Sequence, residues 1–184
     1  FKSVMTDELV KDETGKEMHK SWGNAIWSDE AAEKIGADVV RWKYGVQDIA
    51  KELWVGWKSL DEPRKNLTVL WNVANYLREY FGKGFKTKET KVKSAENRWI
   101  LSKLESLKKK VNANLESLQP HLAAQDLQEF FLNTFSRGYI HFVRDILSED
   151  SEERAEVLQV MYKVMLDIIV MLASLSSLLI ACAA

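Results

Sequence analysis

Apolar residues recur every three or four positions along four consecutive stretches of the chain, the spacing that places them on one face of an α-helix. The first stretch follows Pro63, the second begins near Ser94, the third covers residues 122–147, and the fourth begins near Ser151. The residues expected to face a shared core are Leu67, Leu70, Ala74, Leu77 and Phe81; Ile100, Leu104, Leu107, Val111, Leu115 and Leu118; Leu127, Phe131, Phe135, Tyr139, Phe142 and Ile146; and Val157, Met161, Val164, Ile168 and Leu175. Four such helices with short links predict a mainly α fold that ends in an antiparallel bundle, with Pro120 ending the second helix.

The first 62 residues have a different pattern. Apolar residues within 1–10 predict a short strand, and residues 12–15 (Asp-Glu-Thr-Gly) predict a tight turn. Ser28 is expected to cap a short helix that stops at Gly36, and Asp38 to cap the next helix. Residues 46–63 give no clear pattern.

Composition restricts the class of protein. The chain has 184 residues, of which 46% are hydrophobic and 29% charged, as in a globular protein. The net charge of -1 means that any affinity for RNA must come from local patches. The single cysteine, Cys182, excludes an internal disulfide, so we expect a reducing cytoplasm. Residues 164–184 are apolar enough to suggest a membrane span, but their stripe begins upstream at Val157, which favours a core helix and no membrane.

The stretch from Lys16 to Asn24 is the candidate site. It reads K-E-M-H-K-S-W-G-N. Lys20 would place an ammonium beside a polyphosphate, and Ser21 with the backbone N–H groups before Gly23 would complete an anion-binding concavity. The plain alternative is a solvated lysine in a polar turn.

This stretch resembles the K-M-S-K-S signature loop of class I aminoacyl-tRNA synthetases. Met18, Lys20, Ser21 and the following Gly-Asn match it, whereas Glu17 and His19 replace a usual lysine and serine. Residues 33–42 then resemble the E-K-x-G-A-D-x-x-R segment that follows the loop in the isoleucyl, valyl and leucyl members.

Three helical segments extend the resemblance to residues 4–173. Residues 70–72 are similar to the L-W-N opening of the anticodon-binding bundle in isoleucyl and valyl enzymes. Residues 97–104 are similar to their D-R-W-I-L-S-R-L helix. Residues 136–145 are similar to S-R-W-Y-I…V-R-D, with Gly138 replacing the usual tryptophan.

The resemblance implies a piece of a longer enzyme, as the opening at Phe1 also suggests. It would comprise the end of a Rossmann-type catalytic domain with a short strand (1–27), a stem-contact unit (28–62) and an incomplete anticodon-binding helix bundle (63–184). The isoleucyl members match best and the valyl members remain close. The whole enzyme would be a monomer that uses ATP to activate isoleucine and transfers it to its tRNA, whereas the piece alone would be inactive. A rival interpretation is a non-catalytic, tRNA-binding helical module of the same ancestry.

Site residues follow from the same resemblance. ATP would contact the signature loop, and Lys20 would be catalytic. The ATP-binding residues would be Met18, His19, Lys20, Ser21, Gly23 and Asn24. Mg²⁺ would arrive with ATP, held mainly by phosphate oxygens. The three histidines are too scattered for a metal site, so no protein-bound zinc is expected in this piece.

Contacts to tRNA are predicted on the first long helix and the loop after it. Trp71 would offer a ring to an unstacked base, and Asn72 or Asn75 an amide to its edge. Lys86 and Lys88 would contact phosphate. Two plainer interpretations stand beside these: Trp71 buried between helices, and the lysines simply solvated. Arg137 and Arg144 would brace the bundle through ion pairs with Glu129 or Asp145.

Overall fold

The computed structural model describes residues 4, 6, 8–81, 85–87, 92–148 and 151–182. Its elements in chain order are β1 (Val10–Asp12), α1 (Ser28–Lys34), α2 (Ala37–Gly45), β2 (Leu53–Val55), α3 (Asp61–Tyr80), α4 (Ala95–Glu116), α5 (Pro120–Glu129), a π-helical segment (Phe130–Tyr139), α6 (Ile140–Val143) and α7 (Glu152–Cys182). Short 3₁₀ turns cover Lys20–Trp22, Trp57–Leu60 and Ile146–Ser148. The prediction of a mainly α fold is confirmed.

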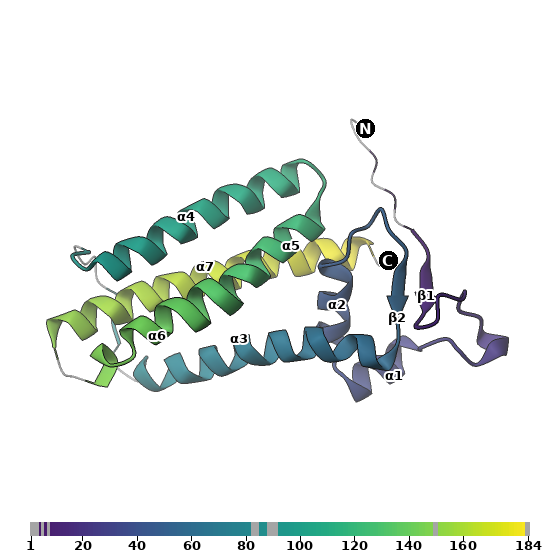
Figure 1. Cartoon of the computed structure of the whole chain (residues 1–184), viewed down its shortest axis with the longest axis horizontal. Helices are drawn as coiled ribbons and strands as arrows, with labels where there is room; N and C mark the ends of the chain where they lie inside the picture. The colour runs from purple at the N-terminus through teal and green to yellow at the C-terminus, as the bar shows by residue number, and fades with distance from the viewer. Residues whose placement is uncertain are drawn as a thin grey trace.

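The long helices lie side by side along the longest axis of the molecule (Figure 1). α5, the π-helical segment and α6 form one continuous rod. The core between the helices contains Phe131, Phe135, Tyr139, Ile100 and Leu104, each at most 1% exposed. The small strand pair and the loop before α1 lie at one end of this body.

Helix α7 is the central element of the bundle, because it packs against α2, α3, α4 and α5. All five residues predicted for its core stripe are buried, and Val157, Met161, Val164 and Ile168 are 0% exposed. In the described part of the chain it is also the one helix, over Glu152–Leu175, that is long and apolar enough to cross a membrane. Over an 18-residue window of this helix the mean hydropathy reaches 1.8, and 44% of that window is buried inside the protein.

The turn between α4 and α5 differs from the prediction. Helix α4 ends at Glu116, and Leu118 is 43% exposed with a left-handed backbone, φ 56°. The expected core role of Leu118 is therefore wrong. Pro120 begins α5 instead of ending α4, because a missing N–H costs nothing in the first turn of a helix.

The rod after Pro120 also departs from a regular helical stripe. Leu127, Phe131, Phe135 and Tyr139 are buried as predicted, but Phe142 is 60% exposed and Val143 is 0% exposed. The wider i→i+5 turns of the π-helical segment rotate the buried face, so the next core position comes one residue later than a 3.6-residue period predicts.

The N-terminal strand lies later in the chain than predicted. β1 is Val10–Asp12, and it pairs in parallel with β2 in the register Val10↔Leu53, Lys11↔Trp54 and Asp12↔Val55. Of the predicted strand region, residues 1–3, 5 and 7 lie outside the described residues. The turn that follows is confirmed: Gly15 has φ 82°, and its N–H donates to the Asp12 carbonyl oxygen at 3.0 Å. An added Cβ there would lie 2.9 Å from the Trp54 ring, so both the backbone and the space require glycine.

Neither predicted cap of the short helices is formed by its side chain. Ser28 is the first residue of α1, and Trp27 occupies the cap position without a side-chain bond. α2 begins at Ala37 after Gly36, whose φ of 104° suits the predicted stop of α1. Asp38 therefore lies inside the first turn, where its charge favours the positive helix end and its carboxylate pairs with Arg41 at 3.0 Å.

Helix α2 attaches this N-terminal part to the bundle. Trp42 is 5% exposed, and its indole N–H donates to Gln128 Oε1 at 2.8 Å. Gln125 Nε2 donates to the Val46 carbonyl oxygen at 2.7 Å. α2 is thus fixed to α5, and through α2 the loop before α1 is attached to the bundle.

One buried polar cluster connects α7, α4 and the π-helical segment. Glu156 Oε1 accepts from the N–H groups of Lys93 and Ser94, at 3.0 and 3.2 Å, and from Asn97 Nδ2 at 2.7 Å. The Tyr139 hydroxyl donates to Asn97 Oδ1. Glu156 therefore holds the N-terminus of α4, where N–H groups otherwise lack partners. Burial opposes its charge, but these hydrogen bonds outweigh burial and lower the pKa of Glu156.

We expect Glu156→Ala to lower the free energy of unfolding by about 3 kcal/mol, because buried donors lose their acceptor. Since its folded pKa is lowered, the charge of Glu156 stabilises the fold fully above its unfolded pKa, about 4.3, and this contribution is lost as pH falls through the folded value. Urea unfolding of parent and Glu156→Gln across pH 3 to 7 measures this. The exposed Glu79→Ala should change stability by less than about 0.5 kcal/mol. A parent and a Gln variant with the same pH dependence would contradict the assignment.

Candidate functional site

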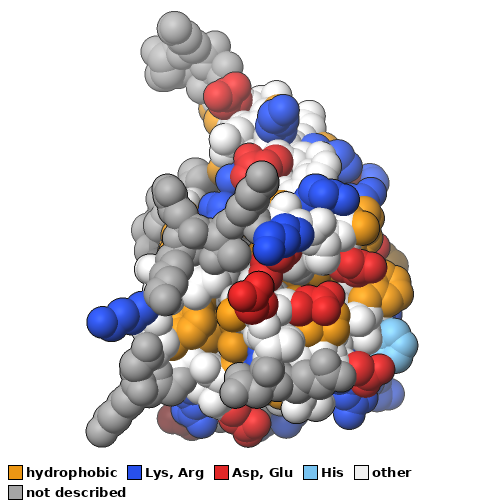
Figure 2. Space-filling view, turned by 90° about the vertical axis from the view of Figure 1, so that its left-hand side faces the viewer, with side chains coloured by type: hydrophobic (Ala, Val, Ile, Leu, Met, Phe, Trp, Pro, Cys, Tyr) orange, Lys and Arg blue, Asp and Glu red, His pale blue; other side chains and the backbone are white. Residues whose placement is uncertain are grey.

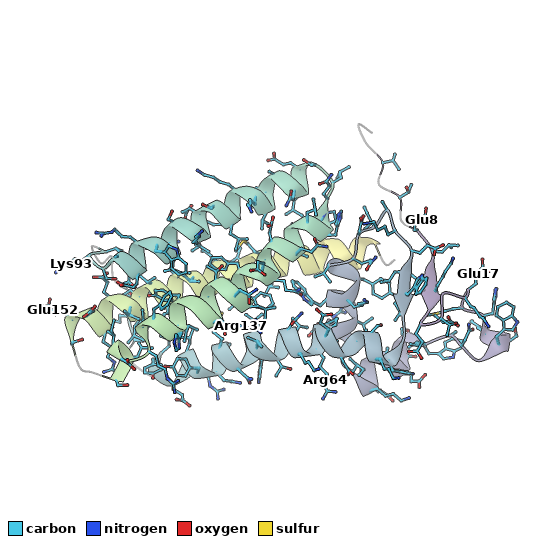
Figure 3. The ribbon with its side chains drawn as sticks, in the orientation of Figure 1. Glu8, Glu17, Arg64, Lys93, Arg137 and Glu152 are labelled. Carbon is cyan, nitrogen blue, oxygen red and sulfur yellow. The ribbon has the colours of Figure 1, made fainter. Side chains whose placement is uncertain are left out.

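The signature loop lies at the end of the molecule that carries the strand pair. Figure 3 shows Glu17 at this end, with Lys93 and Glu152 at the opposite end of the bundle. The loop leaves β1, and an isolated antiparallel bridge between Lys11 and Glu17 returns it alongside that strand. A 3₁₀ turn then presents Lys20 and Ser21, both exposed.

Asp12 and Asn24 close the base of the loop. One Asp12 carboxylate oxygen accepts from the Thr14 hydroxyl at 2.7 Å and from the N–H groups of Thr14 and Lys16 at 2.8 and 3.0 Å. The other accepts from Asn24 Nδ2 at 2.8 Å. The hydrogen bond from the Thr14 hydroxyl, followed by that from Asn24, lowers the pKa of Asp12 well below its usual range, so this carboxylate stays ionised.

The Asn24 amide also bonds to the loop itself. Its Nδ2 donates to the Glu17 carbonyl oxygen at 2.9 Å, and its Oδ1 accepts from the His19 N–H at 3.0 Å. Both ends of the amide are thus engaged within the loop. The structure places Asn24 as the residue that sets the loop's shape, and Gly23 before it takes the left-handed backbone that this closure requires, φ 69°.

Two tryptophans lie in or next to this loop, and one of them contacts Lys20. Its Nζ lies 4.6 Å from the centroid of the Trp27 ring. Trp22 is 64% exposed, and its ring meets His19 edge-on with centroids 4.2 Å apart. His19 Nε2 also lies 3.3 Å from Glu17 Oε2, and Met18 is half-buried.

The structure therefore brings the predicted loop residues together near the exposed Lys20 ammonium. It adds two that the sequence did not indicate, Asp12 and Trp27. The Asp12-x-Thr14 pair is a recognisable signal, because an aspartate often bonds the backbone two residues on. Trp27 gave no such signal, since nothing in the sequence placed its ring over Lys20.

On α3, Trp71 is 67% exposed, which excludes the interpretation of a buried interface tryptophan. Asn72 is exposed and Asn75 is half-buried, one helical turn from Trp71. Lys86 follows the end of α3, and its carbonyl oxygen accepts from Gln159 Nε2 at 2.9 Å. Trp71 lies nine residues before the last residue of α3, so at least about 14 Å of helix axis separates it from this loop. Lys88 lies outside the described residues.

The end of the bundle opposite the signature loop carries both signs of charge. Figure 2 shows Lys and Arg side chains interspersed with Asp and Glu, with hydrophobic side chains between them.

The predicted ion pair between Arg137 and Glu129 is not direct. Arg137 donates to Asn133 Oδ1 at 2.8 Å, and Asn133 Nδ2 donates to Glu129 Oε2 at 2.6 Å.

Comparison with known families places two stretches of the chain, one near each end, in one class. Residues 1–55 match the model for tRNA synthetases class I (I, L, M and V), and residues 97–176 match the anticodon-binding domain of tRNA ligase. The chain belongs to the class I aminoacyl-tRNA synthetases. Within this class, the relatives that it resembles are isoleucine–tRNA ligases.

Three archaeal relatives illustrate the extent of the match. The isoleucine–tRNA ligase of Methanococcus maripaludis is 30% identical over 94% of this chain, and that of Methanothrix thermoacetophila is 31% identical over 94%. The ligase of Methanothermobacter thermautotrophicus is 29% identical over 96%. The chain spans 17% to 18% of the length of these relatives.

A solved structure supports the fold. The chain in the ternary LeuRS-tRNA-LeuAMS complex from Agrobacterium radiobacter K84 superposes with a TM-score of 0.66 and 19% identity. The superposition covers 94% of this chain and 21% of that one. The strand pair and the helices thus share the arrangement of a class I synthetase.

We expect Asn24→Ala to loosen the loop without unfolding the protein, because the bonds it removes are local. Each is worth roughly 1 kcal/mol, so hydrogen exchange at the His19 amide should accelerate about tenfold or more. Exchange measured by NMR or mass spectrometry checks this. Ser21→Ala is the matched control, because no hydrogen bond of its hydroxyl is found among the described residues. Unchanged exchange at His19 would show that Asn24 does not hold the loop.

Proposed function

We propose that this chain is a segment of an isoleucine–tRNA ligase, and that it supplies the ATP-binding signature loop and part of the tRNA-binding surface. The observation that carries the proposal is an exposed lysine in a closed loop, set between a strand and a helix as the family pattern requires. The names of the archaeal relatives support isoleucine over valine as the amino acid. We propose that the whole enzyme is a cytoplasmic monomer.

The chemistry proposed for the loop follows from its charge. In amino-acid activation a carboxylate attacks the α-phosphorus of ATP and pyrophosphate leaves, so negative charge grows on phosphate oxygens. Among the described residues no carboxylate lies within ion-pair distance of the Lys20 ammonium, which is therefore available to stabilise that charge. His19 and Ser21 lie beside it and would bond phosphate or ribose groups, and Mg²⁺ would enter with ATP.

The helical part is proposed to bind tRNA. The match to an anticodon-binding domain over residues 97–176 supports this role, and so does the exposed ring of Trp71 on the adjoining helix α3. Bases splayed from a single-stranded loop stack on such rings. We divide the chain into the end of the catalytic domain (1–27), the stem-contact unit (28–62) and the antiparallel anticodon-binding bundle (63–184).

In the full-length protein that contains this chain, Lys20→Ala should slow ATP–pyrophosphate exchange about a hundredfold, because one preorganised charge contact to the transition state is lost. Affinity for tRNA should stay near the parent value. The exposed Lys58→Ala, on the 3₁₀ turn before α3, should exchange at the parent rate. Equal rates for Lys20→Ala and parent would remove Lys20 from the mechanism.

Trp71→Ala should weaken binding of the cognate tRNA by about tenfold or more, since stacking of one base on an aromatic ring is worth about 1–3 kcal/mol. Filter binding or fluorescence titration of the full-length protein measures this, with unfolding curves to show that the fold is kept. Phe142→Ala is the control, because Phe142 is another largely exposed ring, on α6. If the tRNA affinity of Trp71→Ala matched the parent's, Trp71 would have no role in recognition.

A further inference from the structure

The Lys20 ammonium is held by a ring instead of a carboxylate. Its Nζ lies 4.6 Å from the Trp27 ring centroid, within the range at which an aromatic face attracts a cation. Both side chains are exposed, and Trp27 keeps 54% of its surface open to solvent. One side of the ammonium therefore meets the ring, and the other side faces solvent.

Three other lysines near this end of the chain pair with carboxylates. Lys11 pairs with Glu52, and Lys51 lies 3.0 Å from Asp48. Lys34 lies over the Trp57 ring at 4.4 Å but also pairs with Glu30. A carboxylate neutralises an ammonium and occupies its N–H groups. An aromatic face attracts the ammonium while leaving its charge and its outward N–H groups available.

The backbone of Trp27 is held by the start of α1, whereas Lys20, which it contacts, belongs to the exposed loop. It occupies the cap position of α1 with extended backbone, φ -76° and ψ 143°, and its carbonyl oxygen accepts from the Ala31 N–H at 2.9 Å. Ala31 is 4% exposed, so this turn is anchored in the protein interior. The ring thus connects the flexible four-carbon side chain of Lys20 to a rigid helix.

From these contacts we infer that Trp27 is a positioning residue for Lys20: its indole face limits the rotamers of the lysine and aims the intact positive charge at an incoming polyphosphate. This inference rests on the proposed role of Lys20. The ammonium stays on the ring while its free N–H groups bind phosphate oxygens. Trp27 thereby reduces the conformational freedom that Lys20 would otherwise lose when it reaches the reacting phosphate.

The test uses the full-length protein and ATP–pyrophosphate exchange. Trp27→Leu keeps an apolar side chain but removes the ring, so kcat should fall two- to fivefold, the change expected from an exposed cation–π contact, with KM for isoleucine unchanged. Trp27→Phe should retain most of the parent rate. Trp57→Leu, which removes the ring under Lys34, is the matched control and should keep the parent rate.

A double-mutant cycle separates positioning from general damage to the loop. In the Lys20→Ala background, Trp27→Leu should cause no further loss, because the residue it acts through is gone. A further loss of the same size in that background, or a parent-like rate in Trp27→Leu alone, would overturn the inference. A parent-like rate in Lys20→Ala alone would instead contradict the proposed function.

A spectroscopic measurement tests the contact without turnover. In full-length protein carrying isotope-labelled lysine, the Lys20 ε-methylene NMR signal should be shifted by the Trp27 ring and return to its ordinary position in Trp27→Leu. On addition of inorganic tripolyphosphate to the parent protein, the signal should keep its ring shift. Loss of that shift would mean that phosphate pulls Lys20 off the ring, which would overturn the inference.

Discussion

The structure depends on the burial of α7. This helix packs against α2, α3, α4 and α5, and its inner residues are fully buried. Each large apolar side chain removed from water stabilises the fold by about 1.5–3 kcal/mol, so the repeated inner positions of α7 supply much of the driving force for assembly. Because the other helices pack on α7, its position determines where α2 lies. The position of α2 in turn determines where the signature loop, which precedes α1 and α2 in the chain, is held.

Glu156 gives this apolar packing a unique register. An apolar interface alone tolerates small shifts between helices, whereas the carboxylate of Glu156 must meet the N–H groups of Lys93 and Ser94 and the amide of Asn97 together. A shift of one helix would leave the buried Glu156 carboxylate and Asn97 amide without these partners, at a cost of about 1–3 kcal/mol each. The start of α4 is held in two ways: the Ser94 hydroxyl accepts locally from the Asn97 N–H at 3.1 Å, and Glu156 accepts from the N–H groups of Lys93 and Ser94.

The candidate site follows a different principle at the opposite end of the molecule. Its loop contains little buried surface and is shaped by hydrogen bonds that Asp12 accepts and that Asn24 donates and accepts. The Trp27 ring lies beside the exposed Lys20 ammonium. The Trp42–Gln128 bond fixes α2 to α5, so the loop and the helical bundle are joined through α2.

The helices and the position of the signature loop can be predicted from the sequence, because apolar periodicity and the Gly-Asn ending of the loop are local properties of neighbouring residues. Local spacing does not predict that Val143 and not Phe142 enters the core, since the π-helical turns depend on how the rod packs. Tertiary structure also decided the pairing of β1 with β2, the capping of α4 by Glu156, and the placing of the Trp27 ring over Lys20. Most of these contacts join residues far apart in the chain, and all depend on the three-dimensional path of the backbone, which no local spacing records.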